Sequence, residues 1–329
     1  MVTGAYSVFA SSVEWYRNYL YLLLLHLDDA KGLKPYYSGL RKTIRPPEFQ
    51  SIKFPVPPES EARNICRYVE LETARIDALI KKKTRFIELL KEKRQALITQ
   101  AVTKGLDPTV PMKDSGIEDL EAVPSHWQVR LLSGLATKVT NGYVGPTRNI
   151  LVEDGVRYLQ SLHIKSNRII FGKPYYVTES WSNEHKKSIL NVGDVLIVQT
   201  GDVGQVAVVP EEFAGCNCHA LIIVATTADL DGAYLSWLLN SQFGQASIKR
   251  IQTGAMHPHL NCDQVKTLKI PLPPLDEQLE IVNRIDTDIG RMEVLGERTN
   301  RSIDLLKERR SALITAAVTG QIDLREDAA

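Results

Sequence analysis

The chain has little of several features that mark whole classes of protein. It holds 4 cysteines in 329 residues, too few for the disulfide framework of a small secreted domain. Its longest apolar run, near Tyr19 to Leu25, is interrupted by His26 and two aspartates, far short of the ~20 residues that span a bilayer. No basic stretch precedes an apolar core at the amino terminus, as a secretory signal requires. We therefore expect a cytoplasmic protein with reduced thiols.

Charge of one sign is also missing. Lys and Arg total 40 against 39 Asp and Glu, so the chain is not a histone-like binder and any basic surface must be local. Hydrophobic residues make up 43% and charged residues 24%, which is ordinary globular composition, and the length allows two domains.

The motifs of common enzymes are absent too. The sequence has no G-x-x-x-x-G-K-[ST] phosphate loop, G-x-S-x-G elbow or H-E-x-x-H zinc motif. Cys216, Cys218, His219 and Cys262 are the residues from which a zinc site would be built, but their spacing lacks the usual C-x₂₋₄-C pair. The sequence therefore predicts a non-catalytic chain without a metal or cofactor of its own.

What the sequence does contain is an internal repeat. The stretch from Phe54 to Thr99 reappears without a gap from Ile270 to Thr315. A constant shift of 216 positions carries Pro55 onto Pro271 and Lys91 onto Lys307. Each copy opens with Pro-x-Pro-Pro and acidic residues, which suits a helix amino terminus, and then places apolar residues at helical spacing. Both copies predict one long helix.

The apolar residues of each predicted helix form narrow rows that repeat every seven positions. The rows contain Val69, Ile76, Leu90, Leu97 beside Ile65, Leu79, Phe86 in the first copy, and Ile285, Met292, Leu306, Leu313 beside Ile281, Leu295 in the second. About 40 helical residues would span roughly 60 Å, too long for one small domain to cover. We therefore expect the two helices to pair with each other, antiparallel, as a rigid spacer.

Each predicted helix also carries basic residues late in its run. They are Lys81, Lys82, Lys83, Arg85, Lys91, Lys93 and Arg94 in the first, and Arg298, Arg301, Lys307, Arg309 and Arg310 in the second. Two interpretations stay open: a solvated coiled-coil face, or a face that meets phosphates or another subunit.

The helices divide the chain into residues 1–53, 54–105, 106–269 and 270–329. The third part predicts strands at Asp194–Val198, Gln205–Val209 and Ala220–Ala225, followed by helices at Gly232–Asn240 and Phe243–Ile251. This pattern indicates a mixed α/β domain with a small, curved sheet. The leading part echoes its end, since Tyr19-Leu-Tyr-Leu-Leu-Leu-Leu is similar to Tyr234-Leu-Ser-Trp-Leu-Leu.

Several motifs together resemble the specificity subunit of type I restriction-modification systems. They are Lys269-Ile-Pro-Leu-Pro-Pro-Leu-Asp-Glu-Gln278, Lys307-Glu-Arg-Arg310, and Ala317-Val-Thr-Gly320 with Asp323, preceded by Val192-Gly-Asp-Val-Leu-Ile197 and Gly201-Asp-Val-Gly204. The resemblance extends over almost the entire chain, with the motifs in the family's order.

The resemblance implies two target-recognition domains, each reading one half of a split sequence in double-stranded DNA, on a spacer of antiparallel helices. Two methyltransferase subunits would dock on the helices, and restriction subunits would join them. These partners would use S-adenosylmethionine, ATP and magnesium. Only about fifty residues of a first recognition domain precede Pro55, which predicts a truncated first domain. Two interpretations stay open: a fragment from an internal start, or a half-subunit that pairs with itself or with a second specificity chain.

Sequence-specific reading needs side chains that reach base edges, supported by others that contact phosphates. Four polar stretches offer such side chains. The candidates are Asn141, Tyr143, Thr147 and Arg148; Gln160, Ser161, His163 and Lys165; Gln199 and Thr200; and Thr253, His257, His259 and Asn261. In the second stretch a strand's alternation would place Gln160 on one face with Tyr158, and Ser161, His163 and Lys165 on the other.

Plain surface loops with glycine and proline turns would explain the same stretches. Two functions from other classes therefore stay open: a coiled-coil scaffold that docks methyltransferase subunits without reading DNA, and a hydrolase. Sequence-selective binding would separate the first from a DNA reader, and turnover by the isolated chain would establish the second.

Overall fold

The structure is a computed structural model that describes residues 11–38, 43–254 and 258–324. None of the helices in these ranges is long and apolar enough to cross a membrane. The chain forms two compact units: unit 1 comprises residues 1–90 and 294–329, and unit 2 comprises residues 91–293. Each long helix contributes to both units, so we describe the units separately.

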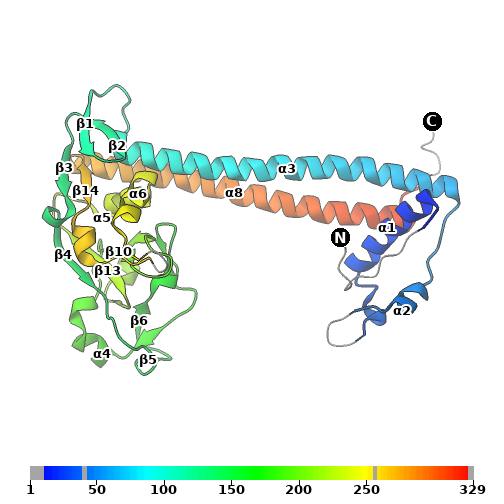
Figure 1. Ribbon diagram of the computed structural model, residues 1–329, viewed down its shortest axis with the longest axis horizontal. Coiled ribbons are helices and arrows are strands. Elements are labelled where there is room, and N and C mark those ends of the chain that lie inside the picture. Colours follow the sequence, from blue (N-terminus) through cyan, green and yellow to red (C-terminus); the bar gives the residue numbers. More distant parts are fainter. Residues whose placement is uncertain (1–10, 39–42, 255–257, 325–329) are drawn as a thin grey trace. The chain divides into compact units, whose positions relative to one another are not determined.

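Eight α-helices and fourteen strands lie in the described residues (Figure 1). The helices are α1 (Glu14–Asp29), α2 (Pro46–Gln50), α3 (Glu59–Lys104), α4 (Glu179–Glu184), α5 (Gly232–Asn240), α6 (Gln242–Ile251), α7 (Cys262–Lys266) and α8 (Leu275–Val318). The strands are β1 (Met112–Ile117), β2 (Leu120–Pro124), β3 (Gln128–Leu131), β4 (Ala136–Asn141), β5 (Leu151–Val152), β6 (Val156–Leu159), β7 (Ile164–Lys165), β8 (Arg168–Ile169), β9 (Tyr176–Val177), β10 (Val195–Val198), β11 (Val206–Val208), β12 (Asn217–Cys218), β13 (Leu221–Thr226) and β14 (Lys269–Leu272). The mixed α/β fold with small sheets and long helices is confirmed.

The centre of unit 2 is an antiparallel sheet in the order β11-β10-β13-β4. Successive residues of β10 point to opposite faces, and each face is buried in a separate apolar core. Val195 and Ile197 belong to the core beneath α5, whereas Leu196 and Val198 belong to the other. Burial on both faces explains why β10 is apolar at every position rather than at alternate ones.

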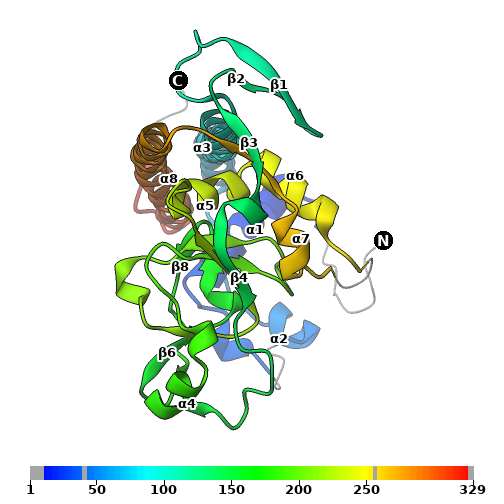
Figure 2. The same ribbon diagram turned by 90° about the vertical axis from the view of Figure 1, so that its left-hand side faces the viewer.

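Unit 2 also contains a second four-stranded sheet, in the order β12-β6-β9-β5, and the hairpin β7–β8. Strands β6 and β8 are labelled in Figure 2. The short strands β3 and β14 pair antiparallel, with Leu131 opposite Lys269. Since β14 leads directly into α8, this pair joins the globular part of unit 2 to the helix.

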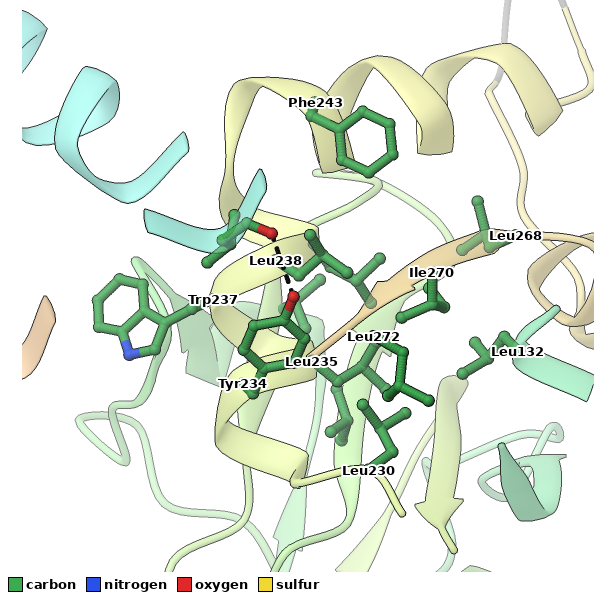
Figure 3. Packing of buried hydrophobic residues seen from close by; sticks show 14 of the residues in the cluster. Leu132, Leu230, Tyr234, Leu235, Trp237, Leu238, Phe243, Leu268, Ile270 and Leu272 are labelled. Atoms are coloured by element: carbon green, nitrogen blue, oxygen red, sulfur yellow. Dashed lines mark hydrogen bonds between the residues drawn. The ribbon is translucent and has the colours of Figure 1, made fainter. Parts of the chain in front are cut away.

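The helix ends of unit 2 are built into its main core. Ile98 and Val102 of α3 cluster with Ile281 and Ile285 of α8. Tyr234 of α5 lies fully buried among them (Figure 3). The single proton of its hydroxyl is shared between the carbonyl oxygens of Val102 (3.1 Å) and Pro271 (2.8 Å). The globular part therefore holds both helices through apolar packing and a shared buried hydroxyl.

Unit 1 repeats this arrangement with the other ends of the same helices. Ile65 and Val69 of α3 cluster with Ile314 and Val318 of α8 and with Tyr19 of α1. The Tyr19 hydroxyl donates to the carbonyl oxygen of Val318 (3.3 Å), as Tyr234 does to Val102 in unit 2. The similarity of the leading segment to the helix at Tyr234 is thus a similarity of structure.

Within each unit the helices run antiparallel. In unit 1 the residues near Ile65 meet α8 near Val318, whereas Asp77, further along α3, pairs with Arg310 (3.0 Å), which lies earlier in α8. The long helices, the strands at 194–198, 205–209 and 220–225, and the two helices at 232–251 agree with the sequence prediction to within a few residues.

Candidate nucleic-acid interface

One end of the central sheet gathers three of the polar segments predicted to contact DNA. β4 ends at Asn141 and β10 at Val198, and both lie beside the start of β13 at Leu221. The backbone N–H of Gly142 donates to the carbonyl oxygen of Leu221 (2.8 Å). The segments that follow β4 and β10, residues 142–150 and 199–205, therefore leave the sheet at the same end.

The third segment is tied to the first two by hydrogen bonds. The backbone N–H of Leu260 donates to the carbonyl oxygen of Gln199 (3.1 Å). Cys262 donates from Sγ to Oδ1 of Asn141 (3.1 Å). Thr253 and His259 exchange backbone hydrogen bonds of 3.0 and 2.8 Å. Segments about 60 residues apart thus form one surface.

Five candidate side chains on this surface are exposed: Arg148, Thr200, Thr253, His259 and Asn261. Thr147 is half-buried. Asn261 already accepts a hydrogen bond from the backbone N–H of Gln264 (2.9 Å) and so caps α7. Arg148 has the longest side chain among these exposed donors. Its guanidinium can also bond to two acceptors of one base.

Tyr143 is held by a cluster of aromatic rings. Its ring lies edge-on to Trp181 (5.0 Å between centroids) and His185 (5.1 Å), which are stacked on each other at 3.9 Å. The ring of His219, whose pKa is lowered by burial, lies 6.3 Å from that of Tyr143 between centroids and bonds to Tyr158 through Nδ1 (3.2 Å). The cluster fixes the segment that leads to Arg148.

The sequence prediction included Tyr143 but omitted Trp181 and His185. Trp181 and His185 lie four positions apart in the helical segment at α4, so their spacing places them on one face. That spacing was the available signal. Nothing in the sequence connects them with Tyr143, which lies about 40 residues away.

His163 is a structural residue of unit 2. It is fully buried, its Nδ1 accepts from the backbone N–H of Gln160 (2.9 Å), and its Nε2 donates to the carbonyl oxygen of Lys173 (2.7 Å). Burial lowers the pKa of the His163 imidazole. Both nitrogens are therefore occupied within the described structure.

The predicted alternation over residues 158–165 is wrong. The strand ends at Leu159, and Ser161–His163 form a 3₁₀ turn that Gln160 caps. The side-chain bonds of Gln160 and His163 to the backbone stabilise this turn in place of a continued strand. As a result His163 and Lys165 do not share a face, since His163 is buried and Lys165 is exposed.

Lys165 lies apart from the other candidates. It belongs to the hairpin β7–β8, which contacts β11 at the edge of the central sheet opposite β4. At the turn of this hairpin Asn167 accepts hydrogen bonds from Ser236 and Asn240 of α5, and Arg168 pairs with Glu293 of α8 (2.7 Å). The hairpin ties the sheet to the helices.

The remaining candidate side chains differ in solvent exposure. Gln199 is only 5% exposed, and its Oε1 atom has no hydrogen-bond partner in the described part of the chain. Gln160 and Ser161 are half-buried. His257 lies outside the described residues.

Cys216 and Cys218 of unit 2 are buried thiols, whereas Cys262 is half-buried. Burial raises the pKa of Cys216 to about 11 and that of Cys218 still further. The described residues contain no group of three or more His, Cys, Asp or Glu side chains arranged to hold a metal ion.

Comparison with known proteins places this architecture in a family. The family model described as the type I restriction modification DNA specificity domain matches residues 124–301, more than half of the chain. The chain belongs to this family. The matched region of the specificity domain begins at β2 and reaches into α8, so it includes every segment of the candidate surface.

Two curated relatives from this family extend the match beyond residues 124–301. The type I restriction enzyme MjaVIII specificity subunit from Methanocaldococcus jannaschii is 20% identical over 84% of this chain and 64% of its own length. The EcoBI specificity subunit from Escherichia coli is 21% identical over 83% of this chain and 59% of its own length. The chain thus spans about three fifths of these specificity subunits.

Solved structures show the same fold. A chain from a study of complex assembly and conformational transition in the type I R-M system matches with a TM-score of 0.69 over 92% of this chain and 71% of its own, at 18% identity. The crystal structure of the HsdS subunit from Thermoanaerobacter tengcongensis matches with a TM-score of 0.56 over 93% of this chain and 70% of its own, at 17% identity.

Proposed function

We propose that unit 2 reads one half-site of a split sequence in double-stranded DNA. The observation that supports this proposal is the convergence of residues 142–150, 199–205, 253–254 and 258–261 at one end of the sheet. Loops held by a rigid sheet are suited to base recognition, since they place short polar side chains in a groove while the sheet fixes their spacing.

The chemistry of the exposed residues supports this function. Arg148 matches the O6 and N7 acceptors of guanine, whereas Thr200 and Thr253 suit phosphates or single base edges. With 40 basic and 39 acidic residues, the whole chain offers little non-specific attraction for DNA. Recognition would therefore depend on these local contacts.

We propose that the paired helices dock methyltransferase subunits. Exposed apolar side chains in unit 1 support this role; they are Leu79 (47% exposed), Phe86 (40%) and Leu89 (46%) on α3, and Leu295 (43%) and Leu305 (57%) on α8. Apolar side chains grouped on a polar helix surface are typical of protein interfaces. Restriction subunits would join through the methyltransferase subunits.

The binding proposal is tested by measuring DNA affinity after selection from a random library. Arg148→Ala should weaken binding to the selected site by about tenfold or more, because a bidentate arginine contact is worth about 1–3 kcal/mol. Lys104→Ala, which removes an exposed charge outside the three segments, should leave the preference unchanged. Equal affinity of wild type and Arg148→Ala would remove the assignment of that residue.

A scaffold that docks methyltransferase subunits without reading DNA would behave differently. It would bind DNA only through phosphates, so its affinity would fall with salt and show no preference for any sequence. Selection of a defined half-site excludes this alternative, and the absence of any enriched sequence would favour it.

We further propose that the chain itself is non-catalytic and acts in the cytoplasm. S-adenosylmethionine, ATP and magnesium would be used by the partner subunits, not by this chain. Methylation or cleavage of DNA by the purified chain alone would contradict this part of the proposal.

A further inference from the structure

Val144 lies on the candidate surface with its apolar side chain in solvent. It is 64% exposed, the highest value among the large hydrophobic side chains of the described residues. It belongs to the segment that follows β4 and lies four positions before Arg148. A single exposed apolar side chain is common on protein surfaces. What distinguishes Val144 is how firmly the backbone on either side of it is held.

The backbone that leads into this valine is fixed by β12 and the start of β13. The N–H of Gly142 donates to the carbonyl oxygen of Leu221 (2.8 Å), and that of Tyr143 donates to the carbonyl oxygen of Cys218 (2.9 Å). The carbonyl oxygen of Tyr143 accepts in turn from the backbone N–H of Ala220 (2.9 Å). Gly142 also lies so close to β12 that a Cβ there would be 2.6 Å from Sγ of Cys218. This part of the segment therefore cannot move away from the strands without losing these contacts.

The backbone that follows Val144 packs against the ring of Tyr143. A Cβ at Gly145 would overlap the hydroxyl and ring carbons of Tyr143, whose ring is held by the aromatic cluster. Pro146 comes next and restricts the conformation of Gly145. Valine is branched at Cβ, so its side chain has few rotamers to lose on binding. The two methyl groups of Val144 are therefore presented in a nearly fixed position.

The chemistry of base edges indicates the partner of such a group. The side chain of Val144 has neither a donor nor an acceptor, so it cannot hydrogen-bond to a base edge or a phosphate. In the major groove, the apolar group by which one base pair differs from the others is the C5-methyl group of thymine. Arg148, on the same segment, can supply polar contacts to a neighbouring pair.

We propose that Val144 contacts the 5-methyl group of a thymine in the half-site that unit 2 reads. The inference rests on the proposed function and adds one base to it, since the half-site must then contain an A·T pair where the DNA meets Val144. Uracil lacks this methyl group but keeps every hydrogen-bonding group of thymine. Replacing that thymine by uracil therefore removes the apolar contact and leaves the polar contacts in place.

The test replaces each thymine of the selected half-site by uracil, one at a time on either strand, and measures the affinity of the full chain for each duplex. For wild type, uracil at one position should weaken binding by about three- to fivefold, the contribution of one buried methyl group. Val144→Ala should bind the thymine duplex more weakly by a similar factor and should no longer distinguish thymine from uracil at that position. The four affinities form a double-mutant cycle, so an effect of uracil on DNA stiffness cancels.

Val192→Ala is the matched control. Val192 is 59% exposed and precedes β10, at the end of this strand away from residues 199–205, so its loss should leave the ratio of thymine to uracil affinity unchanged. Thermal unfolding of Val144→Ala should match that of wild type, because the side chain is exposed.

Two results would overturn the inference while DNA reading by unit 2 still held. One is a selected half-site without thymine on either strand, and the other is a thymine-to-uracil ratio that Val144→Ala leaves unchanged at every position. Failure to select any half-site would instead contradict the proposed function, and the inference with it.

Discussion

Tyr234 shows how a single hydroxyl holds unit 2 together. It is fully buried, and its burial and the nearby Glu277 raise its pKa, so it stays a donor at all physiological pH values. Tyr234→Phe would leave the carbonyl oxygens of Val102 and Pro271 without this donor. We expect a loss of about 1–3 kcal/mol in the free energy of unfolding, measured with urea. Tyr21→Phe, on a side chain 62% exposed, is the control and should change stability very little.

His163 makes the stability of unit 2 depend on pH. Its pKa is lowered in the folded state, so below the unfolded value near 6.5 the unfolded chain binds more protons. The contribution of His163 is therefore fully present above pH 6.5 and is lost as the pH falls through the folded pKa. The difference in unfolding free energy between wild type and His163→Gln should shrink between about pH 7 and pH 5. A difference that does not vary with pH would contradict this.

At the scale of elements, α8 contains two glycines in open helical positions. Nothing lies within 4 Å of a Cβ placed at Gly290 or Gly296. Gly296→Ala should therefore stabilise the protein by about 0.5–1 kcal/mol, since alanine costs less backbone entropy in a helix. Thermal unfolding monitored by circular dichroism measures the effect.

Gly244 of α6 is the contrasting case. A Cβ there would overlap the carbonyl oxygen of Leu238 and the backbone of Leu239. Gly244→Ala should destabilise unit 2 by more than about 1 kcal/mol because the packed core cannot move aside. A stability equal to wild type would show that α5 and α6 do not pack as described.

Elements with a clear period could be predicted from the sequence, whereas their contacts could not. Four consecutive apolar residues predicted β10, and the seven-residue rows predicted α3 and α8. The turn at Ser161–His163 was missed because side-chain bonds from Gln160 and His163 replaced a local strand pattern. The convergence of the three segments depends on β4 pairing with β13, about 80 residues later, and sequence alone does not give that register.

At the scale of the whole molecule, the exposed apolar side chains of α3 and α8 lead to a prediction of their own. Leu79→Glu with Phe86→Glu should abolish association with the methyltransferase subunit, because it places charges in an apolar interface. Co-purification measures this, and Lys82→Glu, an exposed charge change on the same helix, is the control. Binding of unit 2 to its selected DNA should persist, and loss of both properties would point to unfolding instead.

As a result of the repeat, each unit packs against one pair of ends of α3 and α8 in a similar way. Tyr19 with Val318 and Tyr234 with Val102 are the same contact made twice. Among the described residues, the sheet and the converging segments belong to unit 2, so we assign half-site reading to unit 2.

The most direct test of the central claim is the methylome of a methylation-free host that expresses this chain with its methyltransferase subunit. The account predicts a new split motif in which one half-site changes or disappears when Arg148 is replaced. A palindromic motif would mean that two copies of unit 2 read the two halves, and an asymmetric motif that another specificity chain supplies one of them. No new methylation, with both proteins expressed and associated, would contradict the account and favour a scaffold that does not read DNA.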